Sequence, residues 1–273
     1  MKRTTFLWII AFVITIFSAY YQRITGPTYP LSGTEVFQGK EISYKFYRSH
    51  STSKNCPVVQ SLIDSSMSAT LLYKRYKTDD ELTRVPMKIF KDTIVTDGVS
   101  SKMQKGYFAY GEIPVQPQSG KIEYFIRLSK DQQEINIPEK NRPVVRFKGD
   151  VSALLLFPHI IFMFIAMLFA TRAGLEYFNK TPNYKKLVYW TLGFLIVGGF
   201  LFGMLVQKAA FGEYWTGIPF GFDLTDNKTL IALICWIIAA VAMYRSKKPG
   251  LWVLAAAIIM LITFIIPHSV LGS

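Results

Sequence analysis

Apolar and polar positions along this chain follow two different patterns. The first consists of long uncharged segments, which predict membrane-spanning helices. Five segments lack any charged side chain: Thr4–Gln22, Val151–Thr171, Leu187–Gln207, Thr229–Tyr244 and Leu251–Ser273. A helix of about 20 apolar residues crosses the hydrocarbon core of a bilayer, which is about 30 Å thick. We therefore predict five transmembrane helices, the fourth of which is short and gains length from neighbours such as Leu224.

The second pattern occupies residues 35–150 and consists of short β-rich runs separated by turn-forming clusters. The runs are EISYKFYR, SATLLYKRYK, RVPMKIF, GYFAYGEIP, KIEYFIRL, QEINIP and PVVRFKG. In KIEYFIRL, the side chains of Ile122, Tyr124, Ile126 and Leu128 share one face of an extended strand. Seven short strands with turn signals between them predict an antiparallel all-β sandwich.

These patterns divide the chain into four parts. We predict a transmembrane signal anchor at residues 1–22, a linker at 23–34, an extracytoplasmic β-sandwich at 35–150 and a four-span transmembrane domain at 151–273. The four spans are expected at 151–171, 187–207, 229–244 and 251–270. The first apolar run ends in FSAYYQR, with tyrosines where a cleaved signal peptide needs small residues, so we expect an uncleaved anchor.

The formal net charge of +13 indicates membrane topology and not nucleic-acid binding, because of where the charges lie. The residues before the first span and the loops at 172–186 and 245–250 hold nine basic residues and one acid, Glu176. Positive charge near span ends marks the cytoplasmic side. We predict that the N-terminus lies inside, and that the β-sandwich, the 208–228 loop and the C-terminus lie outside.

Two parts of the chain resemble known groups of proteins. The run KIEYFIRLSKDQQEINIPEKNRPVVRF resembles the last hairpin of a fibronectin type III or immunoglobulin-like domain, and the resemblance covers about residues 35–147. It implies that Tyr124 starts the penultimate strand as a corner tyrosine, and that PVVRF closes the fold. The membrane half, with FPHIIFMFIAML, VQKAAFGEYWTGIPFG and DLTDNKT, resembles uncharacterised bacterial multi-pass membrane proteins. That resemblance implies the bacterial cytoplasmic (inner) membrane and no particular activity.

Two histidines fall within predicted spans, His159 after Pro158 and His268 after Pro267. A titratable side chain within a membrane is a functional hypothesis, and Met163 lies one helical turn from His159. One interpretation is a haem b or copper site that uses both histidines, with Met163 as a further ligand. Helix rise places the two imidazoles about 8 Å apart in depth, whereas axial haem ligands should be level. The other interpretation is that each histidine bonds backbone carbonyls freed by its proline, or reaches interfacial water.

The loop GEYWTGIPFGFDLTDNKT, residues 212–229, concentrates acids and aromatic residues between two spans. Its polar residues suit helix capping, and its aromatic residues suit the level of the membrane interface. A second interpretation is a surface for a partner or ligand, formed by Glu213, Tyr214, Trp215, Asp223, Asp226 and Lys228. A third is a hard-cation site that uses Asp223, Asp226 and Asn227.

The chain contains no Walker loop, GxSxG, HExxH, CxxC or dinucleotide fingerprint. We therefore expect a non-enzymatic protein of the lipid bilayer that presents its β-sandwich for binding to, or assembly with, an envelope or membrane protein. A haem- or copper-binding redox or metal-handling protein is the alternative. A third possibility is a membrane enzyme that uses Glu213, Asp223 and His268 at the outer interface.

Overall fold

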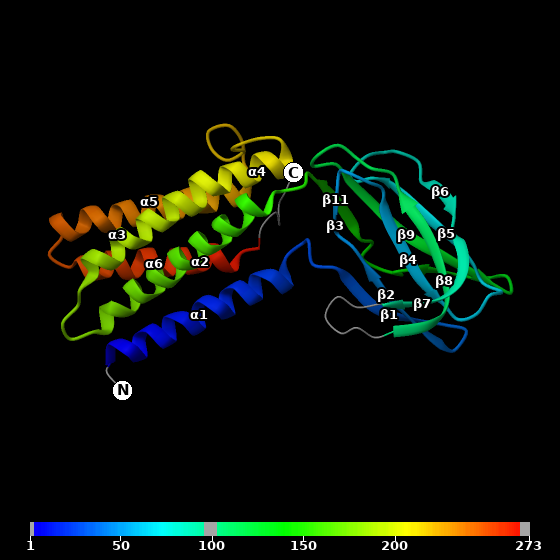
Figure 1. The fold of residues 1–273 in the computed structure, drawn as a ribbon, viewed down its shortest axis with the longest axis horizontal. Coiled ribbons are helices and arrows are strands. Elements are labelled where there is room, and N and C mark those ends of the chain that lie inside the picture. Colours follow the sequence, from blue (N-terminus) through cyan, green and yellow to red (C-terminus); the bar gives the residue numbers. More distant parts are fainter. Residues whose placement is uncertain (1–2, 96–102, 268–273) are drawn as a thin grey trace. The chain divides into compact units, whose positions relative to one another are not determined.

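A computed structural model describes residues 3–95 and 103–267 of the chain (Figure 1). The chain forms two compact units. Residues Thr28–Asp150 form a unit of β-strands, and Met1–Pro27 together with Val151–Ser273 form a helical unit. The predicted linker at 23–34 is shorter than expected, because the first helix continues to Thr25 and the first strand begins at Leu31.

The described part of the helical unit contains six α-helices. They are α1 (Arg3–Thr25), α2 (Ala153–Leu175), α3 (Tyr184–Leu195), α4 (Gly203–Phe211), α5 (Leu224–Arg245) and α6 (Pro249–Ile265). A short 3-10 helix, η1 (Glu176–Phe178), follows α2. A π-helical segment, η2 (Ile196–Phe202), joins α3 to α4, so that Tyr184–Phe211 is helical throughout.

Four helical stretches among the described residues are long and apolar enough to cross a membrane, which suggests a multi-pass membrane protein. They are Arg3–Thr25, Ala153–Phe178, Tyr184–Phe211 and Leu224–Arg245. Helix α6 is apolar but shorter, with 17 residues. The fifth predicted span therefore corresponds to a helix that is about 25 Å long at 1.5 Å per residue.

Helix α5 begins at Leu224, earlier than the predicted start at residue 229. Asp223 is its N-cap residue, and the Asp223 carboxylate accepts hydrogen bonds from the backbone N–H groups of Thr225 (2.8 Å) and Asp226 (3.2 Å). Such a cap satisfies donors that have no partner within the helix. The first turn is polar, so hydropathy alone did not include it in the span.

Small side chains allow the helices of this unit to pack closely. The buried core is lined by Ala166, Ala170 and Ala173 of α2, Ala232, Trp236 and Ala239 of α5, and Val253, Ala256 and Met260 of α6. These positions recur every three or four residues, which places them on one face of each helix. Alanine-rich faces are typical of helices that associate in a bilayer, where close van der Waals contact drives packing.

A buried ion pair joins the end of α2 to the following turn. Arg172 and Glu176 are both buried, and the Arg172 guanidinium donates to the Glu176 carboxylate. The same carboxylate accepts hydrogen bonds from the Asn179 side chain and from the Asn183 backbone, each at 3.0 Å. The guanidinium also lies 5.6 Å from the ring centroid of Trp8 on α1. The sequence analysis had treated both charges as ordinary loop residues.

The β unit contains eleven strands among the described residues. They are β1 (Leu31–Phe37), β2 (Lys40–Phe46), β3 (Ser49–Ser51), β4 (Cys56–Leu62), β5 (Ser68–Arg75), β6 (Thr83–Pro86), β7 (Lys88–Val95), β8 (Met103–Ile113), β9 (Lys121–Lys130), β10 (Gln133–Ile137) and β11 (Val144–Lys148). The largest sheet has the order β3-β11-β9-β5-β6, with β10 also paired to β9. The other sheets are β4-β8-β7 and the β1-β2 hairpin, and all three contribute to one buried apolar core.

All seven predicted β-rich runs contain strands, but three strands were missed and one run is divided. RVPMKIF forms both β6 and β7, which belong to different sheets, and the chain passes from one sheet to the other at Met87. Strand β4 was missed because an inward position is polar. Its buried residues alternate as Cys56, Val58, Gln60 and Leu62. The Gln60 amide donates to the Ser43 carbonyl at 3.0 Å, which offsets part of the cost of its burial.

Tyr124 does not start the penultimate strand, as the resemblance had implied, but lies inside β9 with two strands still to follow. Its buried hydroxyl donates to the backbone carbonyl of Tyr47 at 2.7 Å, 77 residues earlier in the chain. A corner tyrosine bonds the backbone only a few residues upstream, so this bond joins distant segments instead.

Cys56 is buried in the same core, and its burial raises the pKa of the thiol to about 12.

The buried ion pair leads to a stability prediction. Replacing Glu176 with Ala should lower the free energy of unfolding of the helical unit by about 3–5 kcal/mol, because the Arg172 charge would stay buried without its partner. Glu213→Ala is the matched control, since that carboxylate is exposed in the same unit, and it should change stability by less than about 0.5 kcal/mol. Denaturant unfolding in mild detergent measures both, and equal effects would show that the pair is unimportant.

Candidate functional site

The six residues predicted to form an outer contact surface separate into two groups in the structure. Glu213 and Tyr214 are exposed, and Trp215 and Asp223 are half-buried. Asp226 and Lys228 are buried inside the helical unit, so they do not belong to a contact surface. Glu213 and Tyr214 remain available for contact, whereas the carboxylates of Asp223 and Asp226 accept hydrogen bonds that fix the loop and the start of α5.

Asp226 holds the loop between α4 and α5. One oxygen of its carboxylate accepts hydrogen bonds from the Thr216 backbone at 2.6 Å, the Thr216 hydroxyl at 3.1 Å and the Gln207 amide at 2.9 Å. The neighbouring side chain of Asn227 accepts from the Ile218 backbone at 2.8 Å. The polar start of α5 therefore fixes the loop that precedes it, a role that the capping interpretation did not predict.

The loop presents apolar side chains outward. The Phe220 and Phe222 residues are 83% and 90% exposed, and Tyr214 and Ile218 are exposed as well. Trp215 is held inward, because its indole N–H donates to the Ile218 carbonyl at 3.1 Å and its ring stacks on Phe200 at 5.6 Å. Exposed apolar side chains on a fixed loop are typical of a contact with lipid or protein.

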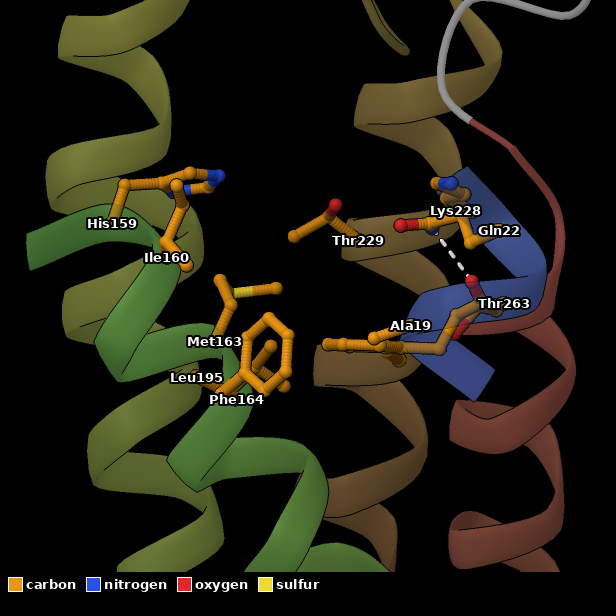
Figure 2. A pocket seen from close by; sticks show the side chains of 12 residues that line it. Ala19, Gln22, His159, Ile160, Met163, Phe164, Leu195, Lys228, Thr229 and Thr263 are labelled. Carbon is orange, nitrogen blue, oxygen red and sulfur yellow. Dashed lines mark hydrogen bonds between the residues drawn. The ribbon is translucent and has the colours of Figure 1, made fainter. Parts of the chain in front are cut away.

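A cavity of about 120 Å³ lies within the helical unit (Figure 2). It is lined by Ala19 and Gln22 of α1, His159, Ile160, Met163 and Phe164 of α2, Leu195 of α3, Lys228, Thr229 and Ala232 of α5, and Thr263 and Phe264 of α6. The cavity therefore brings together His159 and Met163, which the sequence had paired by helical spacing, with Lys228, which it had placed on the surface.

His159 is hydrogen-bonded to a different helix. Its Nδ1 atom lies 2.9 Å from the carbonyl oxygen of Gly198 in the π-helical segment η2. A carbonyl only accepts, so Nδ1 carries the hydrogen in this bond. The prediction that His159 bonds a backbone carbonyl is correct, but the carbonyl belongs to η2 and was not freed by Pro158. Short π-helical segments occur frequently at functional sites.

Gln22 and Lys228 bond the C-terminal end of α6. The Gln22 amide donates to the carbonyls of Phe264 (2.6 Å) and Ile266 (3.3 Å), and the Lys228 ammonium donates to Ile266 (2.6 Å). The last carbonyls of a helix have no partner inside it. A positive charge there also interacts favourably with the helix dipole. The buried lysine thus has a structural partner.

Two glycines of η2 allow α2 and α5 to approach this segment closely. A Cβ atom on Gly198 would lie 2.9 Å from the Cβ of Phe162 and 3.0 Å from the backbone nitrogen of Met163. A Cβ atom on Gly199 would lie 2.9 Å from a methyl carbon of Thr229. Only hydrogen fits at both positions, so the glycines bring the Gly198 carbonyl within reach of His159.

The haem or copper hypothesis named His159, His268 and Met163 as ligands. His159 and Met163 line the same cavity, whereas the other proposed ligand, His268, lies outside the described residues. Residues 3–95 and 103–267 contain no group of three or more His, Cys, Asp or Glu side chains placed to hold a metal ion. In the predicted cation site, Asp223, Asp226 and Asn227 each accept at least one hydrogen bond from a backbone N–H group.

The sequence analysis missed Gln22, Gly198 and Gly199 as residues that build this region. Gln22 was read as the last residue of the first span, and the two glycines as ordinary members of the third. Their roles depend on contacts between segments that are distant in the sequence, 242 residues apart for the Gln22–Phe264 bond and 39 for the His159–Gly198 bond. One local signal was the GG pair inside a long apolar run.

The glycines provide a matched pair of substitutions. Gly198→Ala should destabilise the helical unit by about 1–3 kcal/mol, because the added methyl group overlaps the backbone of α2. Gly193→Ala, on the same helical rod, should be neutral or stabilise by up to about 1 kcal/mol, because its Cβ would meet nothing within 4 Å. Denaturant unfolding in detergent compares the two. If both behave alike, close packing at Gly198 is not needed.

Comparison with protein-family models, curated proteins and solved structures finds no match to this chain. The cavity and the aromatic loop are therefore the features from which a function is inferred.

Proposed function

We propose that this chain is a non-enzymatic, multi-pass protein of the bacterial inner membrane that assembles with another membrane or envelope protein. The observation that supports the proposal is the loop between α4 and α5. Among its exposed residues are four large apolar or aromatic ones, Tyr214, Ile218, Phe220 and Phe222, beside the exposed acid Glu213. Aromatic side chains are enriched at the centres of protein interfaces, where they bury large areas and lose little conformational freedom.

The rigidity of the loop favours a protein partner. Asp226 and Asn227 hold its backbone at Thr216 and Ile218, so the backbone that carries the exposed aromatic residues is ordered before any contact forms. Pre-ordered anchors lower the entropic cost of association. In the proposed topology the N-terminus is inside, five helices cross the bilayer, and the loop and the β unit both face the exterior. There the β unit would act as a fibronectin- or immunoglobulin-like sandwich that adds a second contact surface.

The proposal predicts that the partner is lost when the loop is made polar. The double variant Phe220→Ser, Phe222→Ser should release most of the protein that co-purifies in mild detergent, because two large anchors are removed. Its thermal unfolding should be unchanged, since both side chains are exposed. Quantitative mass spectrometry of the purified complex measures the loss.

Val36→Ser is the control for this experiment, because Val36 is an exposed apolar residue on β1. It tests whether removal of any exposed apolar side chain has the same effect. A photo-crosslinker at position 222 should also capture a protein. If it forms adducts with lipid alone, the loop is a membrane anchor and the proposal is wrong.

The alternative of a metal-handling protein has one observation in its favour, which is that His159 and Met163 line the same cavity. Imidazole nitrogen and thioether sulfur together suit copper. This alternative predicts that the purified protein contains about one copper ion and that His159→Ala removes it, with Thr263→Val as a control elsewhere on the cavity wall. Elemental analysis decides the matter, and an absorbance spectrum without a Soret band would exclude haem.

A further inference from the structure

The cavity in the helical unit has a polar level and an apolar level (Figure 2). Gln22, His159, Lys228 and Thr229 form the polar level. The apolar level lies one helical turn away along each helix: Ala19 before Gln22, Met163 after His159, and Ala232 after Lys228. Gln22 is close to the end of α1 and Lys228 is in the first turns of α5, so the polar level is nearer the helix ends. Such a cavity suits a molecule with a polar head and an apolar body.

Three polar side chains on the wall have used their hydrogens elsewhere. His159 donates from Nδ1 to Gly198, the two hydrogens of the Gln22 amide serve Phe264 and Ile266, and the Thr229 hydroxyl donates to the Thr225 carbonyl at 2.9 Å. A charged imidazole on this largely apolar wall would be costly without a counter-ion, so the imidazole is neutral. What remains on these three side chains is lone pairs: Nε2 of His159, Oε1 of Gln22 and Oγ1 of Thr229.

Lys228 offers hydrogens to the cavity, whereas the other three side chains offer lone pairs. It is 6% exposed, and its ammonium group donates one hydrogen to the Ile266 carbonyl. An ammonium group has three hydrogens and no lone pair, so it can donate further. A head group that matches this wall must offer a hydrogen to the acceptors and accept one from Lys228. A hydroxyl does both, whereas a carboxylate has no hydrogen to offer and an alkylammonium would be repelled.

We propose that this cavity binds the phenolic head group of a neutral, apolar molecule. The hydroxyl donates to Nε2 of His159 or Oε1 of Gln22 and accepts from Lys228, and the ring lies among Met163, Phe164 and Leu195. A volume of about 120 Å³ is close to that of a cavity of about 150 Å³ that admits benzene in another protein, so a single ring fits. This inference is independent of the proposed partner loop.

The test uses the full chain in lipid nanodiscs and isothermal titration with 4-propylphenol. Its O-methyl analogue, 4-propylanisole, has the same ring but no hydrogen to donate. We expect saturable binding of the phenol and about tenfold weaker binding of the anisole, because one hydrogen bond to a buried acceptor is lost. Equal affinities, no saturable binding of the phenol, or stronger binding of 4-propylbenzoate would each overturn the proposal.

A second arm locates the site. Ala19→Leu fills the apolar level without removing a hydrogen bond, and it should abolish phenol binding, whereas Val13→Leu on the exposed side of α1 should leave it unchanged. The Phe220→Ser, Phe222→Ser variant should bind the phenol normally, which separates this site from the partner loop. Binding should also persist in EDTA. Retained binding in Ala19→Leu, or loss of binding in EDTA, would show that another site or a metal ion recognises the phenol.

Discussion

Backbone carbonyls inside a membrane need hydrogen-bond donors, and the helical unit is organised around meeting that need. Hydrocarbon offers no water, so each unsatisfied polar group costs several kcal/mol. Here the carbonyls of Phe264 and Ile266, at the end of α6, accept from Gln22 and Lys228. The Gly198 carbonyl accepts from His159 in addition to the Gly203 backbone N–H. The donors come from α2, α1 and α5, while the acceptors lie on η2 and at the end of α6. These bonds therefore tie five helical segments together, and they give a histidine and a lysine within apolar spans a backbone partner.

The same bonds decide what the cavity can recognise. A side chain that has given its hydrogens to the backbone presents only lone pairs to its surroundings. His159, Gln22 and Thr229 are such side chains. The hydrogen bonds that they donate to the backbone therefore determine that they offer acceptor atoms to the cavity. A polar residue in a span can thus be both structural and functional. One of its atoms makes the hydrogen bond that offsets the cost of burial, and another atom faces the cavity.

Sequence patterns predicted the helices and strands of the fold better than the contacts between them. Each predicted apolar run contains a helix and each β-rich run contains a strand, because burial of a face imposes a period on the sequence. The pattern failed where tertiary contacts stabilise an exception. Gln60 occupies an inward position of β4 because Ser43 accepts its hydrogen, and the chain changes sheet at Met87. The cavity itself was not predicted. His159 and Met163 could be paired because they share a helix, whereas Gln22 and Gly198 are brought to them by packing.

The first turns of α5 connect the two features from which function is inferred. Asp226 and Asn227 hold the aromatic loop, and the next two residues, Lys228 and Thr229, line the cavity. A Cβ atom on Gly217 of the loop would lie 2.7 Å from the Cβ of Asp226, so the loop packs directly on this turn. A shift or rotation of the start of α5 would therefore move the loop and reshape the polar level of the cavity together. The position of this turn therefore sets both how the loop is held and how the polar level of the cavity is shaped.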